Sequence, residues 1–225
     1  MPCFDIVKNL ELDKSFRVAS VMSGFDLKLE HANEHFTGEI ELPEKWNIGL
    51  IVGNSGAGKS TIAREVFGEE AFCNFQYSAK SVIDDMPKSC DVEQISKMFY
   101  SVGFGSVPSW IKPYSVLSTG EKMRVDLARA LLEKDFLVFD EFTSVVDRRT
   151  AQTACMAINK AIKRTDKKFV AVSCHKDVAE YLQPDWIFDT GQMKTFFQQA
   201  LEENSGLTSE KSLWGLGESL GSIII

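Results

Sequence analysis

Residues 53–61 read Gly-Asn-Ser-Gly-Ala-Gly-Lys-Ser-Thr and constrain the fold of this chain more than any other segment. They match the pattern G-x-x-x-x-G-K-[ST], directly after the apolar run at 47–52 and directly before a helical pattern that begins at Lys59. Glycines let such a loop wrap so that successive backbone N–H groups point inward, and the helix N-terminus adds a positive dipole end. The motif in this context predicts a strand–loop–helix unit that binds phosphate groups.

The loop residues have separate expected roles. Lys59 would supply a point charge for the β- and γ-phosphates of a nucleotide, and Ser60 would offer its hydroxyl to Mg²⁺. The alternative is a glycine-rich turn without a ligand, which the flanking strand and helix disfavour. The residues expected to contact the nucleotide are Gly53, Asn54, Ser55, Gly56, Ala57, Gly58, Lys59, Ser60 and Thr61.

Short apolar runs alternate with helical patterns from residue 46 to about residue 190, which is typical of βαβ units. We expect strands at 47–53, 71–76, 136–140, 168–174 and 186–189, and helices at 59–67, 92–102, 120–134, 150–164 and 177–182. Apolar runs of this kind suit central parallel strands that helices cover on both faces. The prediction is an α/β fold with a mostly parallel central sheet.

Two segments before this region, 16–30 and 35–42, are rich in Val, Phe, Ile and Thr and partly alternate. They predict a small N-terminal antiparallel β part. We expect one domain over 1–200, with a helical insertion at about 77–135, and a C-terminal tail over 201–225 that is flexible or docks onto a surface.

Composition excludes several classes of protein. The chain has 225 residues, 44% of them hydrophobic, and 25 basic residues against 32 acidic ones. The net charge of −7 argues against a general phosphate-backbone binder. No apolar run reaches the ~18 residues that cross a bilayer, no signal peptide is evident, and five scattered cysteines suggest reduced thiols. A cytoplasmic protein without membrane insertion is the expectation.

A second carboxylate site follows the apolar run at 136–139. Asp140 and Glu141 would lie at the carboxyl edge of the sheet, where α/β folds bind ligands. Next to a phosphate-binding loop, Asp140 is expected to hold Mg²⁺ and Glu141 to orient or deprotonate an attacking water. The alternative is a strand that simply enters solvent.

Residues 117–121 read Leu-Ser-Thr-Gly-Glu and precede a helical pattern with the letters KMRVDLARALL. This segment resembles the LSGGQ signature of ATP-binding-cassette (ABC) ATPases. Five motifs stand in the order of that family over about 35–191: the loop, the signature, the acidic strand end, 143–147 and 173–175. An ordinary capped helix, with Ser118 or Thr119 as cap and Glu121 in the first turn, is also physically sound, and both interpretations can hold together.

The resemblance implies an ATPase that uses ATP and Mg²⁺. By position, 144–147 is similar to the D-loop ending at Asp147, and His175 to the switch histidine that contacts the γ-phosphate. Gln76 is similar to the Q-loop glutamine near Mg²⁺. The family arranges two subunits head to tail, so that Ser118, Thr119, Gly120 and Glu121 of one subunit would close over ATP held by the other. An ATP-induced homodimer is therefore expected.

This chain departs from the family pattern at several points. Thr119 replaces a signature glycine, and Glu121 is the variant familiar from SMC and Rad50-like chromosome proteins. Lys59 and Ser118 are only 59 positions apart, fewer than in transporter subunits. The missing length falls where transporter subunits contact membrane partners. No adenine-stacking aromatic can be assigned; Phe16, Phe25 and Phe36 are candidates.

We therefore expect a stand-alone ABC-type ATPase that switches a partner protein or nucleic acid. An ATP-binding subunit of a membrane transporter is the alternative, followed by an ATP-dependent dimerisation switch with little turnover. A weaker resemblance, to soluble ABC-type ATPases associated with GNAT-like acetyltransferases, implies a separate acetyltransferase-like partner. A basic run is a candidate nucleic-acid patch, and a solvated helix face is its simpler interpretation: Lys160, Lys163, Arg164, Lys167 and Lys168.

Overall fold

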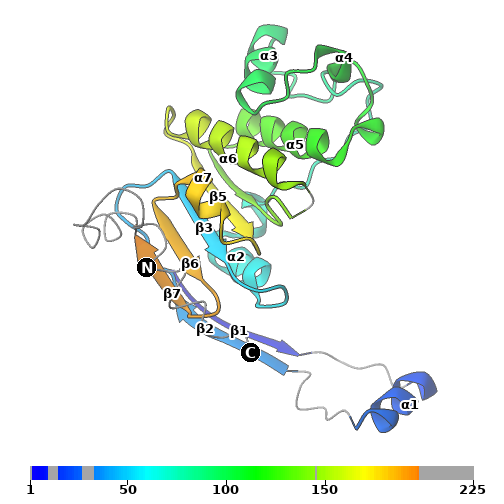
Figure 1. Ribbon diagram of the computed structural model, residues 1–225, viewed down its shortest axis with the longest axis vertical. Coiled ribbons are helices and arrows are strands. Elements are labelled where there is room, and N and C mark those ends of the chain that lie inside the picture. Colours follow the sequence, from blue (N-terminus) through cyan, green and yellow to red (C-terminus); the bar gives the residue numbers. More distant parts are fainter. Residues whose placement is uncertain (1, 10–14, 27–32, 145, 198–225) are drawn as a thin grey trace.

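The computed structural model describes residues 2–9, 15–26, 33–144 and 146–197, and its centre is a five-stranded sheet (Figure 1). The strand order is β4-β5-β3-β6-β7, and only β7 runs antiparallel to its neighbour. In the parallel part, Val52 of β3 pairs with Ser173 of β5, so these two strands end at the same level. The strands are β3 (Ile48–Val52), β4 (Phe136–Phe139), β5 (Lys168–Ser173), β6 (Trp186–Asp189) and β7 (Lys194–Phe197).

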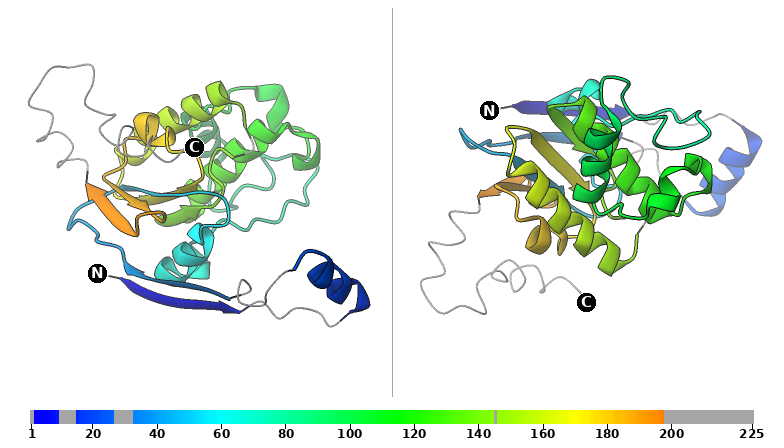
Figure 2. Two further views of the ribbon diagram at one scale, coloured as in Figure 1. Left: turned by 60° about the horizontal axis from the view of Figure 1, so that its bottom comes forward. Right: turned by 90° about the horizontal axis from the view of Figure 1, so that it is seen from above.

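Helices cover both faces of this sheet (Figure 2). Alternate strand residues belong to different clusters, because successive side chains of a strand point to opposite faces. Leu50 packs in the cluster that includes side chains of α3, α5, α6 and α7. Ile51 packs in the cluster with Ile62 and Phe4, on the face of α2 and β1. The helices are α2 (Lys59–Phe67), α3 (Val92–Ser101), α4 (Val107–Trp110), α5 (Thr119–Glu133), α6 (Arg148–Ile162) and α7 (Val178–Leu182).

The predicted α/β class, with its mostly parallel sheet and an antiparallel β part, is confirmed. Within the described residues, no helix combines the length and the apolar character that crossing a membrane requires. The division into a domain over 1–200 and a tail stays a prediction. The tail, with Trp214 and residues 223–225, lies outside the described residues.

The antiparallel part differs from the prediction in its strands. It pairs β1 (Cys3–Asn9) with β2 (Asn33–Glu39), whereas residues 16–24 of the expected first strand form helix α1 (Phe16–Gly24). The Ser15 side chain caps this helix by accepting a hydrogen bond from the Val18 N–H at 3.3 Å. Figure 1 shows α1 set apart from the main body, and none of its residues is buried. The β1 segment was missed because its partner strand lies some thirty residues away in the chain.

The expected strand at 71–76 is also wrong in its extent. Only an isolated parallel bridge between Phe72 and Val138 forms there. The Lys134 ammonium donates to the Phe72 carbonyl at 2.7 Å, so a side chain takes a backbone acceptor that a longer ladder would use. The segment continues as a loop past the end of α5.

Gly49 provides a test of the packing at the centre of the sheet. A Cβ at this position would lie 2.1 Å from the nearest Trp186 ring atom, and Trp186 is fully buried. We expect Gly49→Ala to lower the free energy of unfolding by roughly 1–3 kcal/mol, the usual cost of overpacking a core. Urea unfolding followed by circular dichroism measures this change.

Gly24→Ala is the matched control, because nothing lies within 4 Å of a Cβ added there. It should change stability by no more than about 0.5 kcal/mol, as most surface substitutions do. If Gly49→Ala and Gly24→Ala unfolded at the same urea concentration and with the same slope, the packing described for Gly49 would be contradicted.

Candidate functional site

A cavity of about 320 Å³ lies at the carboxyl edge of the parallel strands. The predicted loop contributes six residues to its lining: Ser55, Gly56, Gly58, Lys59, Ser60 and Thr61. The ends of β4 and β5 contribute Asp140, Glu141, Ser144, Ser173 and Cys174. The loop and the acidic strand end, far apart in sequence, therefore share one cavity.

The backbone of the loop explains its glycines. Gly56 and Gly58 have φ values of 80° and 72°, in the left-handed region that side chains with a Cβ rarely adopt. A Cβ on Gly58 would also lie 2.8 Å from the Phe36 ring of β2. The Lys59 ammonium, at the first position of α2, donates to the Asn54 carbonyl at 2.7 Å. Lys59 thus lies folded over the loop, where it can meet a phosphate.

Ser60 and Asp140 form the centre of the site. The Ser60 hydroxyl donates to Asp140 Oδ1 at 2.8 Å across 80 positions of sequence. Mg²⁺ prefers oxygen ligands and is usually held by one or two protein groups, with waters and substrate phosphates completing its shell. The described residues contain no cluster of three or more His, Cys, Asp or Glu side chains that could hold a metal. The Ser60–Asp140 pair therefore fits Mg²⁺ bound together with a nucleotide.

Glu141 occupies a turn with an unusual backbone. Its φ is 48° and that of Thr143 is 66°, values that non-glycine residues adopt at a cost. The turn is anchored because the Phe142 N–H donates to the Val172 carbonyl of β5 at 2.8 Å, and the Phe142 side chain is buried. Glu141 itself is exposed and lines the cavity. The role expected of its carboxylate, to orient or deprotonate a water, stays a prediction.

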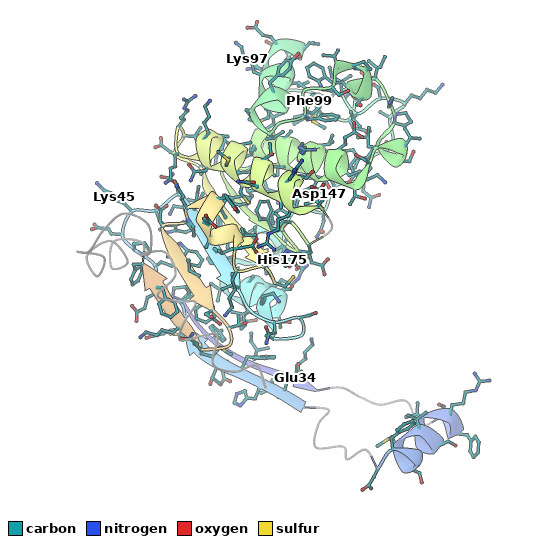
Figure 3. The ribbon with its side chains drawn as sticks, in the orientation of Figure 1. Glu34, Lys45, Lys97, Phe99, Asp147 and His175 are labelled. Atoms are coloured by element: carbon teal, nitrogen blue, oxygen red, sulfur yellow. The ribbon has the colours of Figure 1, made fainter. Side chains whose placement is uncertain are left out.

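His175 follows the end of β5, and Asp147 begins α6 (Figure 3). The His175 N–H donates to the Ser173 hydroxyl at 3.1 Å, and its ring is not among the groups lining the cavity. Asp147 caps α6 by accepting hydrogen bonds from the N–H groups of Arg149 and Thr150. A bond from the Thr150 hydroxyl is the main cause that lowers the pKa of Asp147. The roles expected of both residues stay predictions.

The signature segment forms the start of α5. Ser118 and Glu121 make a capping box, in which the Ser118 hydroxyl accepts from the Glu121 N–H and the Glu121 carboxylate accepts from the Ser118 N–H. The Ser109 hydroxyl also donates to Glu121 at 2.7 Å and is the largest cause of its lowered pKa. The capped-helix interpretation is therefore correct for this segment.

The starts of α5 and α6 lie against each other. A Cβ on Gly120 would lie 3.2 Å from the Thr150 methyl group, and the Thr150 hydroxyl bonds Asp147 at 2.7 Å. None of the residues 118–121 lines the cavity, and neither does Asp147. The signature segment, predicted to close over a second subunit, therefore lies beside the start of α6 and does not line the cavity of its own chain. Ser144, the first residue of the predicted D-loop, does line that cavity.

Gln76 lies outside the cavity and is exposed. Arg129 of α5 holds its backbone, donating to the Gln76 carbonyl at 2.9 Å and lying over the rings of Phe75 and Tyr77. Three loop residues expected to contact the nucleotide also do not line the cavity: Gly53, Asn54 and Ala57. The part of Gln76 in metal binding stays a prediction.

Lys8 of β1 lines the cavity and was missed by the sequence analysis. The alternation of Phe4, Ile6 and Lys8 signals a shared strand face, but their place over the loop depends on pairing with β2. The aromatic candidates for adenine do not line the cavity: Phe16 and Phe25 are 87% and 76% exposed on or beside α1, and Phe36 packs on Gly58.

No family model matches the chain. An uncharacterized ABC transporter ATP-binding protein of Haemophilus influenzae is 31% identical over 135 residues, which are 47% of this chain and 55% of the relative. A probable peptide export ATP-binding protein of Bacillus subtilis, YydI, is 25% identical over 147 residues, or 57% of this chain and 70% of the relative. The chain thus spans little more than half of the first relative.

Solved structures share the fold at low sequence identity. The ATP-binding cassette MJ0796 in a dimeric post-hydrolysis state bound to ADP and Pi has a TM-score of 0.58 and 14% identity, with 83% of this chain and 92% of that chain covered. An inward-facing putative metal-chelate type ABC transporter has a TM-score of 0.59 and 15% identity, with 84% of each chain covered. These likenesses establish the fold.

Proposed function

We propose that this chain, which carries an ABC-type ATPase domain, binds ATP with Mg²⁺ and hydrolyses it to ADP and phosphate. One observation carries the proposal. Lys59, the Ser60–Asp140 pair and Glu141 converge on a single cavity from two segments that lie far apart in sequence. These are the groups needed to bind phosphates, hold a divalent cation and activate a water.

Each group of the cavity has a separate role in the proposed reaction. The loop N–H groups and Lys59 bind the β- and γ-phosphates, and the dipole of α2 favours their negative charge. Ser60 and Asp140 would hold Mg²⁺, which when bound neutralises charge that develops on the phosphate oxygens. Glu141 orients the attacking water and accepts its proton. His175 would contact the γ-phosphate from the end of β5.

A second subunit would complete each site. The surface formed by Ser118, Gly120 and Asp147 presents the N-terminal ends of α5 and α6, two helices of 15 residues each. Such ends favour anions, and this surface is separate from the chain's own cavity. We infer that ATP on one subunit joins it head to tail to the signature of the other, so that nucleotide induces the homodimer.

Phosphate release by the purified chain tests the activity. We expect phosphate to appear with ATP and Mg²⁺ and to stop when excess EDTA removes the divalent cation, because Ser60 and Asp140 cannot neutralise the triphosphate alone. Addition of Mg²⁺ beyond the EDTA should restore the rate. Phosphate release that EDTA leaves unchanged would contradict the assigned metal pair.

Two roles are candidates for this ATPase: the ATP-binding subunit of a transporter and a stand-alone ATPase. The printed names of the relatives favour the ATP-binding subunit of a transporter. Exposed apolar side chains of the helical part offer such a partner a surface: Tyr100, Val107, Ile111 and Val116. The short sequence separation between Lys59 and Ser118 favours the stand-alone ATPase instead.

Membrane fractionation distinguishes the transporter subunit from the stand-alone ATPase. A transporter subunit should sediment with membranes of its own cells, and Ile111→Asp with Val116→Asp should release it while leaving phosphate release intact. A stand-alone ATPase should stay in the supernatant before and after the substitutions. Cytoplasmic placement is common to both candidates.

The other partners receive less support. The relatives are named for transport, so an acetyltransferase-like partner stays a prediction without support. In the basic run, Lys167 pairs with Asp135 at 2.7 Å and Lys168 lies over the Trp46 ring. Because these two lysines have partners, fewer charges of the basic run are available to bind nucleic acid. Nucleic-acid binding also stays a prediction.

A further inference from the structure

The inner face of the β1–β2 hairpin changes from apolar to charged along its length. Phe4, Ile6 and Lys8 share that face because side chains alternate along a strand. Phe4 is buried against Phe188 of β6, with ring centroids 6.0 Å apart, and Ile6 is half-buried. At the next position of this face, the side chain is a lysine that lines the nucleotide cavity. A cation there has no part in the apolar packing of the hairpin.

The cavity has two distinguishable ends. Glu141, Ser144 and the end of β5 lie on one side of β3, because β5 and β4 follow it in that direction across the sheet. The hairpin lies on the other side, where Phe4 contacts β6 and the Glu41 N–H donates to Thr195 of β7 at 3.1 Å. Lys8, further along β1, lines the cavity from the hairpin, whereas Glu141 lines it from the end of β4.

This arrangement sets the direction of the nucleotide. On the proposed function, the γ-phosphate is at Glu141, where hydrolysis occurs, and Lys59 holds the β- and γ-phosphates. The remainder of the nucleotide must then extend away from Glu141, toward the hairpin. Thr61 of α2 and Lys8 both line the cavity, and α2 and β1 are in contact.

We propose that Lys8 is a nucleotide-binding residue whose ammonium contacts the α-phosphate of ATP. An ammonium carries three donors and a compact positive charge, and anionic oxygens are its strongest partners. The α-phosphate is the anionic group at the nucleoside end of the triphosphate. Among the described residues that line the cavity, Lys8 and Lys59 are the two cations.

The surroundings of Lys8 leave its ammonium available for this contact. Its cross-strand partner in the register is Glu34, labelled in Figure 3, and no ion pair joins the two within the described part of the chain. On the opposite face of the hairpin, Asp5 bonds His35 Nε2 at 2.6 Å, a contact that does not involve Lys8. Removing the Lys8 ammonium should therefore affect the nucleotide more than the hairpin.

The test compares nucleotide affinities of Lys8→Met, Lys8→Arg and wild-type protein by titration calorimetry with ATP, ADP and GTP in the presence of Mg²⁺. Lys8→Met should raise the Kd for all three by the same factor, about tenfold, as expected for loss of one charged hydrogen bond at a partly exposed site. Lys8→Arg keeps the charge and should stay within about threefold of wild type. Higher salt should narrow the difference between Lys8→Met and wild type.

Lys45→Met is the matched control, since Lys45 is exposed and lies outside the cavity (Figure 3). Its affinities should equal those of wild type. Circular dichroism and thermal unfolding of each variant show whether the hairpin stays folded, and Lys8→Arg reports on the charge if Lys8→Met is unstable.

Four results would overturn the α-phosphate contact. An unchanged Kd for Lys8→Met would remove Lys8 from the site. A loss confined to ATP and absent for ADP would place the ammonium at the γ-phosphate, and a loss that differs between ATP and GTP would place it at the base. Wild-type protein that binds none of the nucleotides would overturn the proposed ATPase function together with this contact.

Discussion

The Glu141→Gln variant is expected to bind ATP with Mg²⁺ as tightly as wild-type protein and to release phosphate about 10²–10⁴ times more slowly, the usual contribution of a general base. Glutamine keeps the shape of the side chain and one oxygen acceptor, but an NH₂ donor replaces the second oxygen and the amide cannot accept a proton. The loop, Lys59 and the Ser60–Asp140 pair remain intact, so binding should be preserved. Phosphate release and titration calorimetry measure the two effects separately.

The same variant should accumulate as a dimer when ATP and Mg²⁺ are present. Bound ATP links the two subunits, and without hydrolysis nothing removes that link. Light scattering on a size-exclusion column should show a doubled mass with ATP and Mg²⁺, and a monomer without nucleotide. A monomer with ATP bound would indicate that the Ser118–Gly120 surface closes on a different subunit.

Glu65→Gln is the control for Glu141→Gln. Glu65 is exposed on α2, close to the loop in sequence, and does not line the cavity. This variant should hydrolyse ATP at the wild-type rate and should not be trapped as a dimer. If Glu141→Gln turned over as fast as this control, another group would have to activate the water.

Replacing Lys59 with Ala should raise the Kd for ATP with Mg²⁺ about 10- to 100-fold, because a hydrogen bond to a charged group contributes about 1.5–3 kcal/mol. The loss should be larger for ATP than for AMP, which lacks the β- and γ-phosphates that Lys59 binds. Phosphate release should fall as well, since the variant lacks a positive charge beside the reacting phosphate. Titration calorimetry with ATP and AMP measures the difference.

The control for Lys59→Ala is Lys97→Ala. Lys97 lies on α3 in an exposed ion pair with Glu93 at 2.7 Å and is labelled in Figure 3. Its removal should leave both affinities unchanged. The assignment of residues 53–61 as a phosphate-binding loop would be wrong if Lys59→Ala bound ATP with the wild-type dissociation constant and was folded by circular dichroism.

The parts of the fold that the sequence predicts well depend on neighbouring residues. The glycines of 53–58, the helix that starts at Lys59 and the capping box of Ser118 and Glu121 all involve contacts within a few positions. Conformational preferences and capping act over such distances, so a short window of sequence contains their cause. The apolar runs of β3 and β5 are likewise long enough to predict buried parallel strands.

The N-terminal part could not be predicted in the same way. Residues 16–24 are apolar enough for a strand, yet Ser15 caps them as a helix, and residues 3–9 take the place in the hairpin. Which strand pairs with β2 depends on packing against β6 and α2, and no local pattern states that. The contact of Lys8 with the cavity follows from this pairing alone.

The loop motif, Asp140 and Glu141 are recognisable from their residue types and their place after apolar strands, so the sequence alone predicts the groups of the site. How these groups meet depends on the tertiary structure. It joins Ser60 to Asp140 across 80 positions, sets Glu141 in a left-handed turn and brings Lys8 over the loop. The physical reason is that such contacts depend on which strands lie side by side, and burial of the whole sheet fixes that order.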